Sequence, residues 1–132
     1  MKTIYYCHDK QNDPQVRRHE LETVGYHVQL FDSGGALVRA IARELPALVL
    51  MDVLLDGANG FEVCAGLDLR TRKELAVILF AGVYTRPAYR DEALELGVEA
   101  FVDSEIPHPE LIAEISKAIA ARRGNDQEPL AA

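Results

Sequence analysis

The chain has 132 residues, 48% of them hydrophobic, and a formal net charge of −7. This length suits one compact domain, and the negative charge argues against a broad basic surface that would bind nucleic acid directly. The longest apolar stretch, at residues 47–51, is too short to cross a bilayer, and the N-terminus has no apolar segment typical of a secretion signal, so we expect no membrane association.

Short apolar runs alternate with helical patterns, as expected of a parallel sheet built from βαβ units. In chain order these are a strand at 3–8, a helix at 14–24, a strand at 26–31, a helix at 34–45, a strand at 47–51, a helix at 61–69, a strand at 75–80, a helix at 87–96, a strand at 98–102 and a helix with its apolar stripe at 111–119. Ser33 is placed to cap the second helix, and Pro46 to end it. Right-handed crossovers then favour a doubly wound α/β sheet.

The pattern predicts one domain over residues 1–123, followed at 124–132 by a disordered tail or the start of a linker. The two cysteines, Cys7 and Cys64, are far apart and each lies beside apolar residues. They form neither a zinc motif nor a disulfide framework, so we expect buried, reduced thiols and a cytoplasmic location.

Ligands of doubly wound sheets bind at the carboxyl ends of the strands. The residues that follow the predicted strands are His8, Asp9, Asp52, Ala81, Gly82, Asp103, Ser104 and Glu105. Adjacent central strands would bring Asp9 and Asp52 into one pocket. Paired carboxylates there can hold Mg²⁺, which prefers oxygen ligands, and a carboxylate can itself accept a phosphoryl group.

Four segments resemble the receiver domains of response regulators, the CheY-like family. Residues 48–52 and 57–64 are similar to the family's phosphoacceptor strand and the loop and helix that follow it. Residues 25–28 resemble the junction before its second strand, and residues 93–101 resemble its fourth helix and fifth strand. The similarity extends over residues 1–122. It implies a flavodoxin-like fold with five parallel strands in the order 2-1-3-4-5 and five helices.

The resemblance also implies roles for individual residues. Asp52 corresponds to the phosphoacceptor and Asp9 to a metal-binding acid, with the backbone carbonyl of Leu54 as a third ligand to Mg²⁺. Phe101 lies at the aromatic position that changes rotamer on activation in many relatives.

The chain departs from the family at three positions of the expected pocket. His8 replaces the first of two acids, and Ala81 or Gly82 replaces a Ser or Thr. Ser104 and Glu105 lie where the family has a Lys before a Pro. A lost lysine contact of this kind is worth roughly 1.5–3 kcal/mol. We therefore expect an atypical receiver, and Lys10, one residue after Asp9, is a possible substitute cation.

The resemblance implies a two-component phosphorelay, in which a histidine kinase or phosphotransfer protein phosphorylates Asp52. A downstream protein or output domain would then bind the surface formed by residues 87–96, 98–102 and 111–119, which could also form a homodimer. The missing lysine and hydroxyl favour an alternative, a pseudo-receiver that binds its partner without phosphorylation.

An enzyme of another kind fits the sequence poorly. A phosphohydrolase with an Asp nucleophile needs a second Asp two residues after the first, but Asp9 is followed by Lys10 and Gln11. A flavin binder needs a phosphate-binding loop after the first strand, and residues 9–14 are acidic and contain no glycine. We expect no catalytic activity beyond phosphoryl acceptance and self-dephosphorylation at Asp52.

Overall fold

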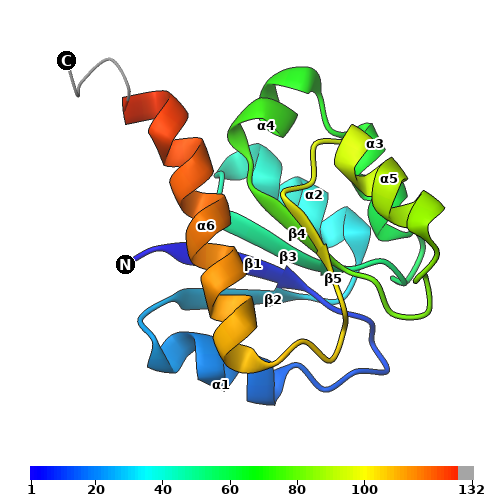
Figure 1. Ribbon diagram of the computed structural model, residues 1–132, viewed down its shortest axis with the longest axis horizontal. Helices are drawn as coiled ribbons and strands as arrows, with labels where there is room; N and C mark the ends of the chain where they lie inside the picture. The colour runs from blue at the N-terminus through cyan, green and yellow to red at the C-terminus, as the bar shows by residue number, and fades with distance from the viewer. Residues whose placement is uncertain (128–132) are drawn as a thin grey trace.

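A five-stranded parallel sheet forms the centre of the molecule, with helices on both faces (Figure 1). This computed structural model describes the backbone of residues 1–127 and the side chains of residues 1–122. The strands are β1 (Thr3–Cys7), β2 (His27–Phe31), β3 (Leu48–Asp52), β4 (Val77–Phe80) and β5 (Ala100–Val102). Their order across the sheet, β2-β1-β3-β4-β5, confirms the predicted topology.

Six helices occur in the part of the chain that the structure describes, one more than predicted. They are α1 (Gln15–Thr23), α2 (Gly34–Arg43), α3 (Gly60–Gly66), α4 (Leu69–Glu74), α5 (Pro87–Glu95) and α6 (His108–Gln127). The predicted helix at 61–69 was wrong at its end, because the chain becomes extended at Leu67. A new helix then begins at Leu69, and its N-cap is Asp68, whose carboxylate accepts the N–H of Thr71 at 2.8 Å.

The boundary predicted at residue 124 stays a prediction. The backbone of α6 continues as a helix to Gln127, which is past that boundary. The remainder of the predicted tail, residues 128–132, lies outside the described residues.

Alternating side chains of each strand build two separate apolar layers. On β3, Leu48 and Leu50 pack beneath α1 and α6, whereas Val49 and Met51 pack beneath α2, α3 and α5. Figure 1 shows the same division, with α1 and α6 on one side of the sheet. Both cysteines are buried and unpaired, as the sequence predicts, and burial raises the pKa of Cys7 to about 12.

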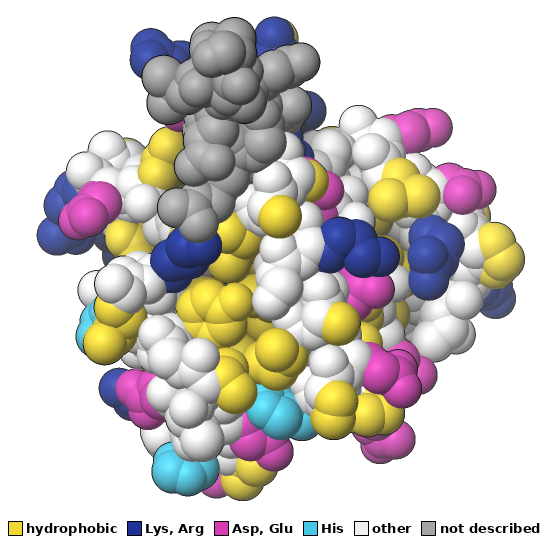
Figure 2. All heavy atoms as spheres, turned by 60° about the vertical axis from the view of Figure 1, so that its left-hand side comes forward, with side chains coloured by type: hydrophobic (Ala, Val, Ile, Leu, Met, Phe, Trp, Pro, Cys, Tyr) yellow, Lys and Arg dark blue, Asp and Glu magenta, His cyan; other side chains and the backbone are white. Residues whose placement is uncertain are grey.

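The face turned toward the viewer in Figure 2 carries hydrophobic side chains at its middle, while Lys and Arg side chains are scattered around them. The layer beneath α1 and α6 includes partly buried members such as Tyr26 and Ile112. Within the described residues, we find no helix with the length and apolar character that a bilayer crossing requires.

Candidate functional site

Asp52 is the last residue of the central strand β3, and its side chain lies on the α1 and α6 face of the sheet. Its position two residues after Leu50 dictates this orientation, since strand side chains alternate between faces. Phe80, its register partner on β4, belongs to the same apolar layer. Tyr6 of β1 completes this group at the carboxyl end of the sheet.

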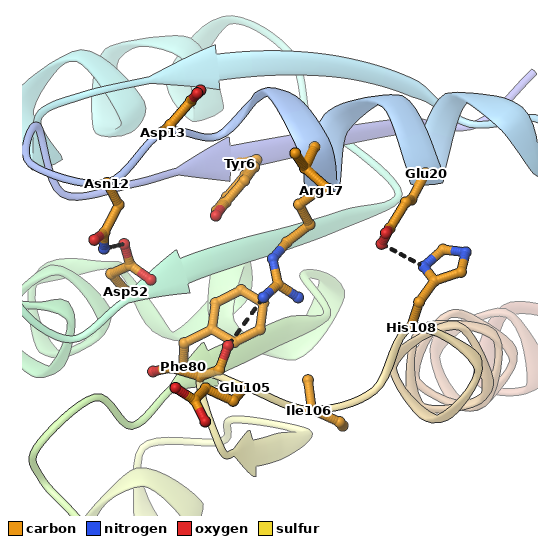
Figure 3. A pocket seen from close by; sticks show the side chains of 12 residues that line it. Tyr6, Asn12, Asp13, Arg17, Glu20, Asp52, Phe80, Glu105, Ile106 and His108 are labelled. Carbon is orange, nitrogen blue, oxygen red and sulfur yellow. Dashed lines mark hydrogen bonds and ion pairs between the residues drawn. The ribbon is translucent and has the colours of Figure 1, made fainter.

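A cavity of about 570 Å³ opens beside Asp52, between α1 and the loop that connects β5 to α6 (Figure 3). Its acidic lining residues are Asp13, Glu20, Asp52 and Glu105, and its basic lining residues are Arg17 and His108. The Asp52 carboxylate, Arg17 of α1 and His108 of α6 therefore line one cavity.

Two hydrogen bonds hold one oxygen of the Asp52 carboxylate. Oδ2 accepts the backbone N–H of Asp9 at 2.8 Å and the side-chain amide of Asn12 at 3.4 Å. Burial raises the pKa of the Asp52 carboxyl, while these two hydrogen bonds lower it in part. Among the described residues, no hydrogen bond is directed to Oδ1, so this oxygen remains available for chemistry.

Asp9 contacts Asp52 through its backbone N–H, but Asp9 is not among the residues that line the cavity. The Oδ1 atom of Asp9 also accepts the N–H of Gln11 at 3.2 Å, which fixes the loop after β1. Over the described residues, no group of three or more His, Cys, Asp or Glu side chains is arranged to hold a metal. Asp9 and Asp52 nevertheless offer carboxylate oxygens, the donor type that Mg²⁺ prefers while it keeps several waters.

The side chains on either side of Asp9 in sequence, His8 and Lys10, make other polar contacts. The ring nitrogen Nδ1 of His8 lies 3.0 Å from the carbonyl oxygen of Asp9, and its ring packs edge-on against Tyr6. The Nζ atom of Lys10 forms an exposed ion pair with Asp56 at 3.0 Å. Lys10 is absent from the cavity lining, so the structure does not bring this candidate cation to Asp52.

Ser104 connects two loops at the rim of the site. Its hydroxyl oxygen accepts the backbone N–H of Gly82 at 2.8 Å and thereby ties the loop after β4 to the loop after β5. Gly82 has a φ of +59°, a conformation that favours glycine. Ala81 is buried and has no hydroxyl, so Ser104 supplies the hydroxyl that contacts this loop.

Phe101 is buried on the opposite face of the sheet, at the inner end of a row of aromatic rings. It stacks on Phe61 at 6.0 Å between ring centroids, and Phe61 stacks on Tyr89 at 6.1 Å. Tyr84, in the loop after β4, packs edge-on against Tyr89 at 5.1 Å. This aromatic row thus extends from the β4–α5 loop to the strand β5.

Arg17 is a site residue that sequence reasoning missed. Its guanidinium lies over the ring of Phe80, 4.4 Å from the centroid, and donates to the carbonyl oxygen of Ser104 at 3.0 Å. Burial and the charge of Asp52 raise the pKa of Tyr6 to about 12, whereas Arg17 lowers it. The available signal was its place in the first turn of the helix that follows the loop of Asp9.

The sequence matches the family model for the response regulator receiver domain over residues 5–116. The chain belongs to this family. It is accordingly a receiver domain of two-component signalling, and Asp52 lies at the end of its central strand β3.

Solved structures of receiver domains share this fold. A receiver domain protein from Clostridium thermocellum superimposes with a TM-score of 0.83 at 18% identity, covering 93% of this chain and 98% of its own. The chemotaxis response regulator CheY4 of Vibrio cholerae superimposes with a TM-score of 0.78 at 18% identity, covering 89% of this chain and 98% of its own. The receiver domain of a Pseudomonas aeruginosa sensor histidine kinase superimposes with a TM-score of 0.75 at 20% identity, covering 90% of this chain and 98% of its own. That structure has a magnesium ion in its active site cleft.

The partly buried carboxyl of Asp52 makes stability depend on pH. Because its folded pKa is raised above the ordinary 3.8, the folded receiver binds this proton more tightly than the unfolded chain. The free energy of unfolding therefore falls as the pH rises from 3.8 through the folded pKa. We expect Asp52→Asn, which cannot ionise, to be more stable than the wild type in urea unfolding at neutral pH. The difference in the free energy of unfolding between the variant and the wild type should disappear below the ordinary Asp pKa. A difference that does not change with pH would contradict this account.

Proposed function

We propose that this receiver accepts a phosphoryl group on Asp52 and thereby changes its affinity for a partner protein. The observation that supports this proposal best is the Asp52 carboxylate itself, which has Oδ2 held by Asp9 and Asn12 and Oδ1 without a donor among the described residues. Oδ1 would form the new P–O bond while the P–N bond of a phosphohistidine breaks, and the departing histidine nitrogen would keep the electron pair. No catalytic activity beyond this step and self-dephosphorylation is proposed.

Asp9, Asp52 and the carbonyl of Leu54 would hold Mg²⁺ in this proposal. When bound, the ion neutralises charge on the phosphoryl oxygens. The presence of magnesium in the active site cleft of the Pseudomonas aeruginosa neighbour supports the same choice here. The loop after β1 would have two roles, because Asp9 would provide a carboxylate to Mg²⁺ and its N–H orients Asp52.

The phosphoryl donor would be a histidine kinase or a phosphotransfer protein. The surface formed by α5, β5 and α6 would contact the downstream protein, an output domain or a second copy of the chain. The buried, unpaired cysteines favour a reducing, cytoplasmic setting, and the net charge of −7 disfavours direct binding to nucleic acid.

One observation favours the alternative, a pseudo-receiver that binds its partner without phosphorylation. Ser104, at the position of the family's lysine, already bonds Gly82 at 2.8 Å in the unphosphorylated protein. The two loops that phosphorylation would draw together are therefore connected beforehand. A surface that binds its partner constitutively would not need phosphorylation to connect these loops.

Binding of beryllofluoride, a phosphoryl analogue, separates the two functions. We expect Mg²⁺ with beryllofluoride to shift the amide signals of ¹⁵N-labelled protein at Asp52, Ala81 and Phe101 in a saturable manner. Asp52→Asn should abolish these shifts, because the amide side chain cannot form the beryllium–oxygen bond that mimics acyl phosphate. An unchanged wild-type spectrum at millimolar Mg²⁺ would exclude phosphorylation and leave the pseudo-receiver.

A further inference from the structure

Arg17 carries a positive charge into the cavity beside Asp52 without a carboxylate partner. In the described part of the chain, its polar contacts include the carbonyl oxygen of Ser104 at 3.0 Å, and none of the ion pairs found there involves it. A guanidinium has five N–H donors, so most of them remain for a further ligand.

The sheet register places Phe80, the ring beneath this guanidinium, on the strand next to Asp52. Phe80, whose ring lies beneath Arg17, pairs with Asp52 across adjacent strands, and such strands are about 4.8 Å apart. Both side chains point to the α1 and α6 face. Figure 3 shows Arg17 descending from α1 onto the Phe80 ring, with Asp52 on the same side of the sheet.

The other basic groups near the cavity already have contacts of their own. His8, whose charge lowers the pKa of the Asp52 carboxyl, lies with Nδ1 3.0 Å from the carbonyl oxygen of Asp9. His108 contacts Glu20 at 3.0 Å, and Lys10 contacts Asp56 at 3.0 Å. The remaining charged lining residues are acidic. Once phosphorylated, Asp52 carries about two negative charges instead of the one on its carboxylate, so this acidic space needs a cation. Arg17 is the basic residue of the lining that no carboxylate pairs with among the described residues.

We propose that Arg17 binds the phosphoryl group on Asp52 and takes the place of the lysine that Ser104 replaces. This inference rests on the proposed phosphorylation. The planar guanidinium matches phosphoryl oxygens in a two-pronged contact. To make that contact, Arg17 releases the carbonyl of Ser104, the same residue whose hydroxyl holds Gly82. The movement of one side chain therefore reaches both loops at the rim.

Titration of beryllofluoride in the presence of Mg²⁺, followed by amide NMR, tests the role of Arg17. We expect Arg17→Gln to weaken beryllofluoride binding by about 10- to 100-fold, as the loss of one charge-assisted contact predicts. Arg17→Lys keeps the charge and should recover part of the affinity. Arg18→Gln is the matched control, because Arg18 pairs with Glu22 on the exposed side of α1 and should bind as the wild type does.

Titration with Mg²⁺ alone distinguishes the loss of the Arg17 charge from a folding defect of the variant. We expect Arg17→Gln to bind Mg²⁺ at least as tightly as the wild type, since the removed group is a cation. Arg17→Met, which keeps the apolar stem over Phe80, gives a second neutral variant. Neutral variants that bind beryllofluoride like the wild type would overturn the role of Arg17 and leave the proposed function intact. Joint loss of Mg²⁺ and beryllofluoride binding would show a structural role only, and failure of the wild type to bind would overturn both proposals.

Discussion

We expect Phe80→Ala to lower the free energy of unfolding by about 3–5 kcal/mol, the usual cost of removing a buried aromatic ring. Phe80 is only 2% exposed and is one of the largest fully buried side chains. Its ring packs near Tyr6, 6.2 Å between centroids, and carries the guanidinium of Arg17 on its outer face. The substitution therefore leaves a cavity at the end of β4 and removes the surface that positions Arg17. Urea unfolding monitored by far-ultraviolet circular dichroism measures the loss.

Leu69→Ala is a suitable control for this measurement. Leu69 begins α4 and is 71% exposed, so its truncation should change stability by less than about 0.5 kcal/mol. Phe80→Leu should cost less than Phe80→Ala, because it refills part of the volume, yet it still removes the aromatic face beneath Arg17. A loss below 1 kcal/mol for Phe80→Ala would mean that the ring is not packed as described.

Gly60→Ala should destabilise the protein by about 1–3 kcal/mol through overpacking. A Cβ at this position would lie 2.9 Å from the carbonyl oxygen of Asp52, 3.1 Å from Leu79 and 3.2 Å from the Cα of Val53. Two of these contacts are to backbone, which cannot rotate away. The N–H of Gly60 also donates to Val53 at 2.7 Å, so the start of α3 is fixed against β3. Thermal unfolding and the beryllofluoride titration should both report the change, because Asp52 must move.

The same substitution at the other end of α3 should have the opposite sign. A Cβ at Gly66 would meet nothing within 4 Å, and the residue does not have a positive φ. Gly66→Ala should therefore stabilise the helix by up to about 1 kcal/mol, since alanine loses less backbone entropy. Equal effects at the two glycines would contradict the close packing assigned to Gly60.

The strands were predictable because a parallel sheet that is covered on both faces demands continuous apolar runs. The helix α4 was missed for a physical reason. It has no buried residue, so it has no apolar stripe, and its formation depends on the local cap that Asp68 provides. Asp68 also lies within the single helix that the sequence pattern predicts at 61–69 and caps a separate helix there. Periodicity detects helices that pack against a core, and α4 packs little.

The sequence predicts the acidic residues Asp9 and Asp52 of the site, but it does not predict which basic residue lies beside them. Asp9 and Asp52 end neighbouring strands, so topology alone brings them together. The choice between Lys10 and Arg17 depends on side-chain direction, which sequence distance does not reveal. Lys10 is nearest to Asp9 in the chain, but the β3–α3 loop offers it Asp56. Arg17 lies in the first turn of α1, and its guanidinium extends over Phe80.

The aromatic row between Tyr84 and Phe101 gives the receiver an optical property. The chain has five tyrosines and no tryptophan, so tyrosine dominates its near-ultraviolet absorption. Tyr84 and Tyr89 are packed at 5.1 Å with their rings nearly perpendicular, 87° apart, and Tyr84 belongs to the loop that Ser104 restrains through Gly82. Near-ultraviolet circular dichroism is sensitive to such fixed packing. A rearrangement of the β4–α5 loop would therefore change the ellipticity of the unlabelled protein, and this signal can be followed in real time as a phosphoryl donor is added.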